Sequence, residues 1–199
     1  MFVKCTYWED TEGFPWERAQ MLVKNGEFNS HFTVKTDKRE EFLLFQNGNT
    51  ISTRIAIAYS KNNNLKAEVE KINSIESFKK FELISYIGDN WIDTYFSKDK
   101  NFNIVKISNL NSVLAMINSN RKDIHITAND LGIKYIIKKN NLNNVFIKNI
   151  NFVEASDIEF KFCLLKSYPN SKALMAEIEK NLTIAKNSGI IDKIISKYL

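Results

Sequence analysis

Apolar positions recur along the chain at two spacings, and each spacing predicts a different kind of element. Short runs rich in β-branched and aromatic residues predict strands, because these side chains suit a pleated, half-buried surface. Apolar residues three or four positions apart predict helices with one buried face. The expected strands are residues 2–8, 28–34, 50–59, 81–87, 102–107, 123–127, 145–152 and 160–165. The expected helices are residues 15–23, 65–78, 91–96, 110–117, 131–137, 171–189 and 190–198.

Two glycines mark expected helix ends. Gly26 follows the first helical stripe and Gly189 follows the long C-terminal one, where a helix stop belongs. Strands that alternate with helices of this length predict βαβ units, and therefore an α/β fold with mainly parallel sheets flanked by helices. In open sheets of this kind, ligands bind at the carboxyl ends of the strands.

Composition places the chain among ordinary globular proteins. Of its 199 residues, 44% are hydrophobic and 26% are charged, which is enough apolar material for a real core. The longest apolar runs, such as residues 55–58, are strand-sized and far too short to span a bilayer. Residues 1–8 lack the pattern of a signal peptide, which fits a cytoplasmic protein, a mature form or a sequence without its front end.

The charge and the cysteines of the chain indicate which kinds of partner and which metal sites are expected. The net charge is +5, but the lysines are scattered among Glu and Asp, so a solvated surface is favoured over a nucleic-acid interface. Cys5 and Cys163 lie far apart, and His31 and His125 lack metal-ligand spacing relative to them. The simpler interpretation is two buried thiols, although a disulfide is open if the chain is exported. No metal and no cofactor are expected.

No catalytic pattern is evident in the sequence. It contains no Gly-x-Ser-x-Gly elbow, no glycine-rich phosphate loop and no His-Glu-x-x-His. His31 and His125 each lie in an expected strand, where a core or surface histidine is the ordinary outcome. A binding module is therefore expected rather than an enzyme.

Four stretches resemble the type II periplasmic solute-binding proteins, specifically the extracellular family that includes the polar amino-acid binders. Residues 15–19, with the Leu, Lys, Gly and Phe that follow, resemble a helix and strand of its first lobe. Residues 36–40 resemble its Thr-x-x-Arg turn, and residues 119–123 its Gly-Arg-x-Asp strand entry, with Asn120 in place of Gly. Residues 187–198 resemble its C-terminus. The order and spacing of the four stretches match across nearly the whole chain.

The resemblance implies two lobes that close on a ligand by a hinge motion. Lobe one would hold residues 1–55 and 160–199, lobe two residues 56–159, with crossings near 54–59 and 159–165. The chain departs from the family in lacking the first strand and helix of lobe one. Lobe one would then be incomplete, or be completed by a homodimer or an exchanged segment, because an open sheet edge invites pairing.

The resemblance places four ligand-binding residues in lobe one. Arg39 would hold a ligand carboxylate in a bidentate fork; the alternative is a surface arginine paired with a neighbouring glutamate. Trp16 would form an aromatic wall, or lie buried in the lobe. Thr33 and Val34 lie on the strand and loop that lead to Arg39, where Thr33 offers a hydroxyl and an N–H group.

Lobe two would complete the site with Asp89, Asn90 and Asp130. Gly88, Asp89 and Asn90 begin a helix, where N–H groups attract anions. Asp89 stands where the family has a Ser, so a role as a helix cap is favoured over a role in the ligand site. Asp130 would hold a ligand ammonium only with a local shift, since Ala128 stands at the family's position.

Three functions follow in order of preference. The first is a solute-binding component of an ABC importer, periplasmic or on the cell surface, which traps a small polar, carboxylate-bearing ligand such as an amino acid. Its partner would be the transporter permease. The second is a divergent member without a ligand that acts through protein–protein contacts. The third is a dehydratase-type enzyme, for which the sequence marks no general acid or base.

Overall fold

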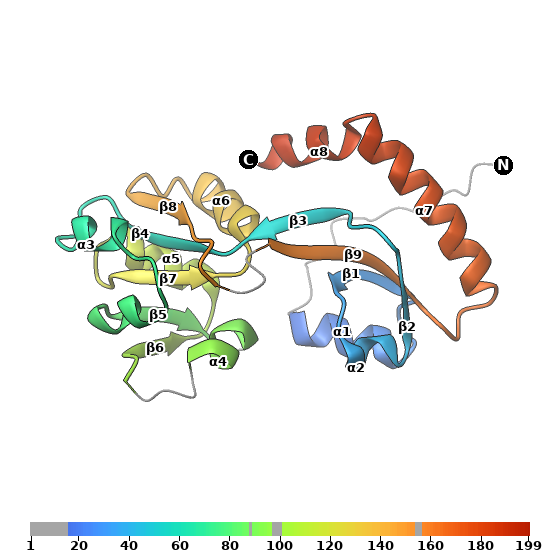
Figure 1. Ribbon diagram of the computed structural model, residues 1–199, viewed down its shortest axis with the longest axis horizontal. Coiled ribbons are helices and arrows are strands. Elements are labelled where there is room, and N and C mark those ends of the chain that lie inside the picture. The colour runs from blue at the N-terminus through green and yellow to red at the C-terminus, as the bar shows by residue number, and fades with distance from the viewer. Residues whose placement is uncertain (1–15, 88, 97–100, 154–156) are drawn as a thin grey trace.

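The computed structural model describes residues 16–87, 89–96, 101–153 and 157–199 (Figure 1). The expected strand at residues 2–8, Cys5 and Gly88 lie outside these ranges. Two sheets lie side by side along the long axis of the molecule, each flanked by helices. The expected α/β fold, with sheets flanked by helices, is confirmed.

The first sheet is built around one long strand near the end of the chain. This strand, β9 (Asp157–Leu165), pairs along one edge with β1 (Ser30–Val34). Along its other edge β9 pairs with β2 (Leu43–Phe45) through residues 163–165 and with β3 (Ile51–Arg54) through residues 157–160. Every one of these pairings is antiparallel. We call this sheet with its helices lobe one. The helices are α1 (Trp16–Lys24), α2 (Asp37–Glu40), α7 (Ser171–Asn187) and α8 (Ile190–Tyr198).

The second sheet has the strand order β6-β5-β7-β4-β8. Its strands are β4 (Ala56–Ser60), β5 (Leu83–Tyr86), β6 (Ile104–Ile107), β7 (Ile124–Thr127) and β8 (Val145–Asn149). Strand β5 is parallel to β6 and β7, whereas β4 is antiparallel to β7 and β8. We call this sheet with its helices lobe two. The helices are α3 (Lys66–Glu70), the 3-10 helix η1 (Glu76–Lys80), α4 (Asn90–Phe96), α5 (Leu110–Asn118) and α6 (Asp130–Lys139).

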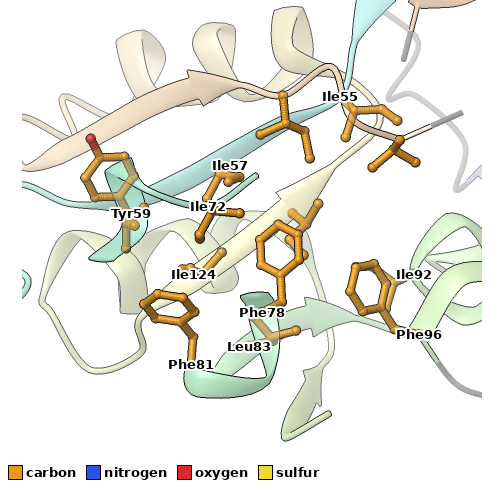
Figure 2. Close-up of a cluster of buried hydrophobic side chains, with 14 residues drawn as sticks. Ile55, Ile57, Tyr59, Ile72, Phe78, Phe81, Leu83, Ile92, Phe96 and Ile124 are labelled. Carbon is orange, nitrogen blue, oxygen red and sulfur yellow. The ribbon is translucent and has the colours of Figure 1, made fainter. Parts of the chain in front are cut away.

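Both faces of the second sheet are covered by apolar side chains. On one face, Phe78 and Phe96 pack edge to face with Ile57, Leu83 and Ile124 in the same cluster (Figure 2). On the other face, α5 and α6 cover a second cluster. Burial from both sides explains why residues 55–59 form an unbroken apolar run, since Ile55 and all five residues of β4 are buried.

Several expected elements differ from the observed ones. The sheets are not mainly parallel, because β9 returns against β1, β2 and β3 and because β4 runs against both of its neighbours. The expected strand at residues 50–59 is divided at Ile55, where the chain passes from one sheet to the other. The expected helix at residues 65–78 is only α3 followed by η1. In the first turn of η1, the Ser77 hydroxyl bonds to the side chains of Asn73 and Ser74 in the segment between the two helices, which competes with helical pairing.

The two glycine helix ends are confirmed. Gly26 and Gly189 have φ values of 80° and 70°, in the left-handed region that glycine adopts without a steric penalty. Gly189 thereby turns the chain from α7 into α8, and α8 then reaches lobe two, where Tyr198 packs against Tyr135 of α6 with ring centroids 5.9 Å apart. Within the described residues, no helix is both long and apolar enough to cross a lipid bilayer.

Candidate functional site

The carboxyl ends of β5 and β7 point toward lobe one (Figure 1). Because β6 is parallel to β5, its carboxyl end lies at the same edge. The helices α4, α5 and α6 begin just after these strands, so this edge carries the polar loops of lobe two. Two of these helices are capped by their own side chains: Asn109 accepts a hydrogen bond from Ser112 N–H, and Asn129 accepts one from Gly132 N–H, each at 2.9 Å.

Asp89 serves as a local cap of α4. Its Oδ2 accepts a hydrogen bond from the Ser85 hydroxyl at 2.6 Å, and its Oδ1 accepts one from Ile92 N–H at 3.3 Å. The residue is buried. This arrangement matches the favoured interpretation of Asp89 as a helix cap. Asn90 is the first residue of α4, and its side chain is not among those described.

Asp130 is also engaged within the protein. Its Oδ1 accepts the Arg54 N–H at 2.8 Å, and its Oδ2 forms an ion pair with Lys134 Nζ at 2.6 Å. Only 4% of the residue is exposed. Both oxygens of this carboxylate therefore already have partners, and a ligand ammonium would have to displace one of them.

Arg39 lies on the short helix α2 of lobe one and is held at two of its nitrogens. Its Nη1 donates to the Val34 carbonyl at 2.7 Å and its Nε donates to Gln20 Oε1 at 2.8 Å. Burial lowers the pKa of Arg39 from its usual value. The alternative of a surface arginine paired with Glu40 or Glu41 is not seen among the ion pairs of the described residues, where Glu40 pairs with Lys35 at 2.8 Å.

The other lobe-one candidates lie on β1 and α1, the two elements that supply the hydrogen-bond partners of Arg39. Val34 supplies the carbonyl that Arg39 binds. Thr33 is fully buried, and its hydroxyl lacks a hydrogen-bond partner in the described structure. Trp16 begins α1, the helix that carries Gln20, but its side chain is not described. The structure thus gathers Arg39 and Val34 at one place in lobe one, and sets Asp89 and Asp130 on lobe two.

A polar hollow of about 600 Å³ opens beside the same loop of lobe one. It is bounded by the segment that joins β1 to α2 and by one face of β9. Its lining residues are Val34, Lys35, Thr36, Asp37, Glu40, Asp157, Glu159 and Lys161. A second hollow of about 360 Å³ shares Asp157 and lies where the chain crosses between the sheets; it is also lined by Arg54, Asn149, Ile150 and Asn151.

The larger hollow is richer in acidic than in basic side chains. Its two lysines are both paired, Lys35 with Glu40 at 2.8 Å and Lys161 with Glu159 at 3.3 Å. Asp157 lies 3.7 Å from Arg54, and its side chain is largely exposed. The hollow therefore offers acidic groups to a cation, next to a loop fixed by a guanidinium.

Sequence reasoning missed the acidic lining. A period of two along β9 puts Asp157, Glu159 and Lys161 on one face of that strand, and this signal was available from the sequence. Asp37 and Glu40 flank Arg39 within a single helical turn, which was also visible. What no local pattern indicated is that β9 runs antiparallel beside β1 and brings the two sets together.

His125 is a buried histidine with one unsatisfied nitrogen. Its Nδ1 lies 2.9 Å from the Ile84 carbonyl, which can only accept, so Nδ1 carries the proton and Nε2 is left without a partner in the described structure. Burial lowers the pKa of His125, an effect that the Ile84 carbonyl and Asp89 oppose. Burial and the nearby Arg39 likewise lower the pKa of His31, the second of the two histidines.

Acid should destabilise the fold through His125. A histidine whose folded pKa lies below its unfolded value of about 6.5 leaves the folded state with fewer bound protons, so stability falls as the pH drops below about 6.5. We expect His125→Gln to reduce the fall in melting temperature between about pH 7 and pH 5. Because His31 is less buried than His125, His31→Gln should reduce this fall by a smaller amount. A His125 variant as acid-sensitive as the parent protein would contradict this assignment.

Cys163 is a free thiol in the core of lobe one. Its Sγ donates to the His31 carbonyl at 3.0 Å, and burial raises the pKa of this thiol to about 12. Such a thiol is unreactive at neutral pH, because the thiolate is the reactive form. The expectation of a buried thiol is confirmed for Cys163.

No protein-family model matches the chain, and no curated protein sequence matches it. Solved structures do match. The arginine-bound amino acid ABC transporter substrate-binding protein AbpA of Streptococcus pneumoniae aligns with a TM-score of 0.70 at 17% identity, over 93% of this chain and 73% of that one.

Two further structures extend the comparison. One of them comes from work on glutathione import through GshT and the cystine ABC importer TcyBC of Streptococcus mutans. It aligns with a TM-score of 0.70 at 15% identity, covering 93% of this chain and 75% of that one. A histidine kinase sensor domain similar to periplasmic binding proteins aligns at 0.67 and 14% identity, covering 92% and 75%. At these identities the likeness establishes the fold: the chain has the two-lobed architecture of the periplasmic binding proteins.

Proposed function

We propose that the chain is a solute-binding protein that captures a small polar ligand between its two lobes. The observation that carries this proposal is the charged hollow on lobe one, bounded by the β1–α2 segment, by residues of α2 on either side of Arg39 and by β9; lobe two would close over it. Concave sites of several hundred Å³ suit small ligands, which a few polar groups then orient. The proposal includes lobe bounds of 1–55 with 160–199 and of 56–159, with the hinge at the crossings near 54–59 and 159–165; residues 157–159, at the second crossing, already pair with β3 in the lobe-one sheet.

The ligand we propose carries a carboxylate and a positive charge, as an amino acid does. Arg39 is the proposed carboxylate anchor, because two of its nitrogens are fixed and the guanidinium fork is already oriented. The acidic lining of the hollow, including Asp37 and Asp157, would receive the ammonium. Thr33, Val34 and the ring of Trp16 would complete the lobe-one side.

Lobe two would contribute fewer ligand contacts than the family resemblance implies. Asp89 and Asp130 each have both carboxylate oxygens in use, so their role in the proposal is to shape the edge that closes over the ligand. Asn90 stands at the start of α4 beside Asp89 and is the remaining candidate there. The neighbouring structure described as bound to L-arginine supports a ligand of this class.

The partner and location follow from the same proposal. Similar structures are described as ABC transporter binding proteins, which supports a transporter permease as partner and a periplasmic or cell-surface location. A non-enzymatic role is favoured, since the similar structures are described as binding proteins and sensor domains.

A thermal-shift screen tests the proposal. We expect at least one amino acid, with L-arginine as the first probe, to raise the melting temperature saturably, because a ligand at 100 times its Kd stabilises the folded state by about 2.7 kcal/mol. Acetate and a simple alkylamine at equal concentration are the controls, since each presents only one of the two charges. A flat response to all amino acids and small carboxylates would contradict ligand capture.

One observation favours a second candidate, a module that acts through protein contacts. Helices α7 and α8 expose a row of apolar side chains, and α8 has no buried residue. The exposed members are Ile184, Ile190, Ile194 and Tyr198. Apolar patches of this kind mark interaction surfaces. A stable dimer in size-exclusion chromatography, together with a flat thermal-shift screen, would support this candidate.

A further inference from the structure

Two hydrogen bonds that do not belong to either sheet connect the two lobes at their junction. Thr53 and Arg54 are the last residues of β3 in lobe one. The Thr53 hydroxyl donates to the Ala128 carbonyl at 2.9 Å, and the Arg54 N–H donates to Asp130 Oδ1 at 2.8 Å. Both acceptors lie just after β7 in lobe two. Thr53 and Asp130 are each only 4% exposed, so water competes little for these bonds.

Lobe two holds the accepting loop in a fixed shape. Asn129 caps α6 through Gly132 N–H at 2.9 Å, and its own N–H donates to the Thr127 hydroxyl at 3.1 Å. Asp130 is the first residue of α6, where a negative charge is favoured, and its second oxygen pairs with Lys134. The carboxylate is therefore oriented before it meets the Arg54 N–H.

The two bonds lie beside the point where the chain crosses. Ile55 alone separates β3 from β4, and its carbonyl accepts the Ile150 N–H at 3.0 Å from the returning chain. A rotation of one lobe about this crossing would change the Thr53–Ala128 and Arg54–Asp130 distances directly. We propose that these two bonds form a hinge latch that sets the angle between the lobes, with Asp130 as its positioning residue.

The latch gives Asp130 a role different from the ammonium anchor that the sequence suggested. It is a property of the unliganded protein, and it stands whether or not the proposed ligand binds. Its test therefore needs no ligand, so that its failure and the failure of the proposed function are distinguishable.

The test measures the distance between the lobes by double electron–electron resonance. Nitroxide labels are placed at Lys38→Cys on α2 and Ala115→Cys on α5, both exposed positions, in a Cys5→Ser background with the buried Cys163 left in place. The parent protein should give one narrow distance distribution. Thr53→Val combined with Asp130→Ala removes the donor of one bond and the acceptor of the other, and should widen or shift that distribution.

The matched control is Asp123→Ala. Asp123 Oδ2 also accepts a backbone N–H, that of Glu82 at 2.9 Å, but within lobe two. This control should leave the distance distribution unchanged. If the double variant loses its far-UV circular dichroism signal, the test uses Thr53→Val alone, which replaces a hydroxyl with a methyl of similar size. This single variant should also widen or shift the distance distribution between the two labels. A distribution that superposes on that of the parent, or one that Asp123→Ala shifts equally, would overturn the latch.

Discussion

Replacing Arg39 with alanine should weaken binding of a carboxylate-bearing ligand by about 30-fold or more. Truncating one partner of a hydrogen-bonded charge pair in a partly buried site costs at least about 2 kcal/mol, and each 1.4 kcal/mol is a factor of ten. Arg39 is oriented for this contact because Gln20 and the Val34 carbonyl hold two of its nitrogens. Isothermal titration calorimetry with the ligand identified in the screen gives the affinity directly.

Two matched variants separate recognition from folding. Arg39→Lys keeps the positive charge but loses the bidentate fork, so its affinity should fall between those of the parent and Arg39→Ala. Gln20→Met removes the acceptor of the Arg39 Nε and leaves the guanidinium in place, so its affinity should fall less than that of Arg39→Ala. An Arg39→Ala protein that melts like the parent and binds the ligand as tightly would end the assignment of Arg39.

Replacing Phe78 with alanine should destabilise the protein by about 3–5 kcal/mol, the range measured for buried aromatic residues truncated to alanine. Phe78 is fully buried at the centre of the lobe-two core (Figure 2). Its ring packs edge to face against Phe96, with centroids 5.7 Å apart, and is tilted against Phe152 at 6.2 Å. Alanine would leave a cavity that these flanking rings cannot close. Equilibrium unfolding in urea measures the loss.

Phe146→Ala is the control for this loss. Phe146 belongs to the same lobe and also contacts an aromatic ring, that of Tyr59 at 5.8 Å, but 37% of it is exposed. Its truncation removes less buried area and should cost much less than that of Phe78. Equal losses for the two variants would mean that burial does not control the stability of lobe two.

The parts of the fold that sequence predicted well are those set by local chemistry. Gly26 and Gly189 end helices because both positions require positive φ, and a single glycine in the sequence is enough to predict such a position. The stripes that became α5, α6, α7 and α8 were clear because each repeats over several turns. Strand direction was not predictable in this way, since β9 meets β1 more than a hundred residues away and no local pattern records that the two run in opposite directions.

In the candidate site, too, local features could be predicted from the sequence and long-range contacts could not. Arg39 was proposed as a ligand-binding residue because residues 36–40 resemble a short turn motif, and that role stays a prediction. A cap was favoured for Asp89 because Asp commonly begins helices, and its hydrogen bond from Ile92 N–H is that of a cap. The partners of Asp130 could not be foreseen, because the N–H that it binds belongs to a residue 76 positions earlier. His125 was expected to be a core or surface histidine, and it is a buried one; its unpaired nitrogen could not be predicted, because it depends on how β5 and β7 lie together.

The position of β9 sets an order of assembly during synthesis. Among the described strands, β1, β2 and β3 pair with β9, and these pairings cannot form until residues 157–165 leave the ribosome. By then every strand of lobe two has already emerged. The described strands of lobe two are therefore available for pairing before β9 is, and β9 then completes the described pairings of β1, β2 and β3.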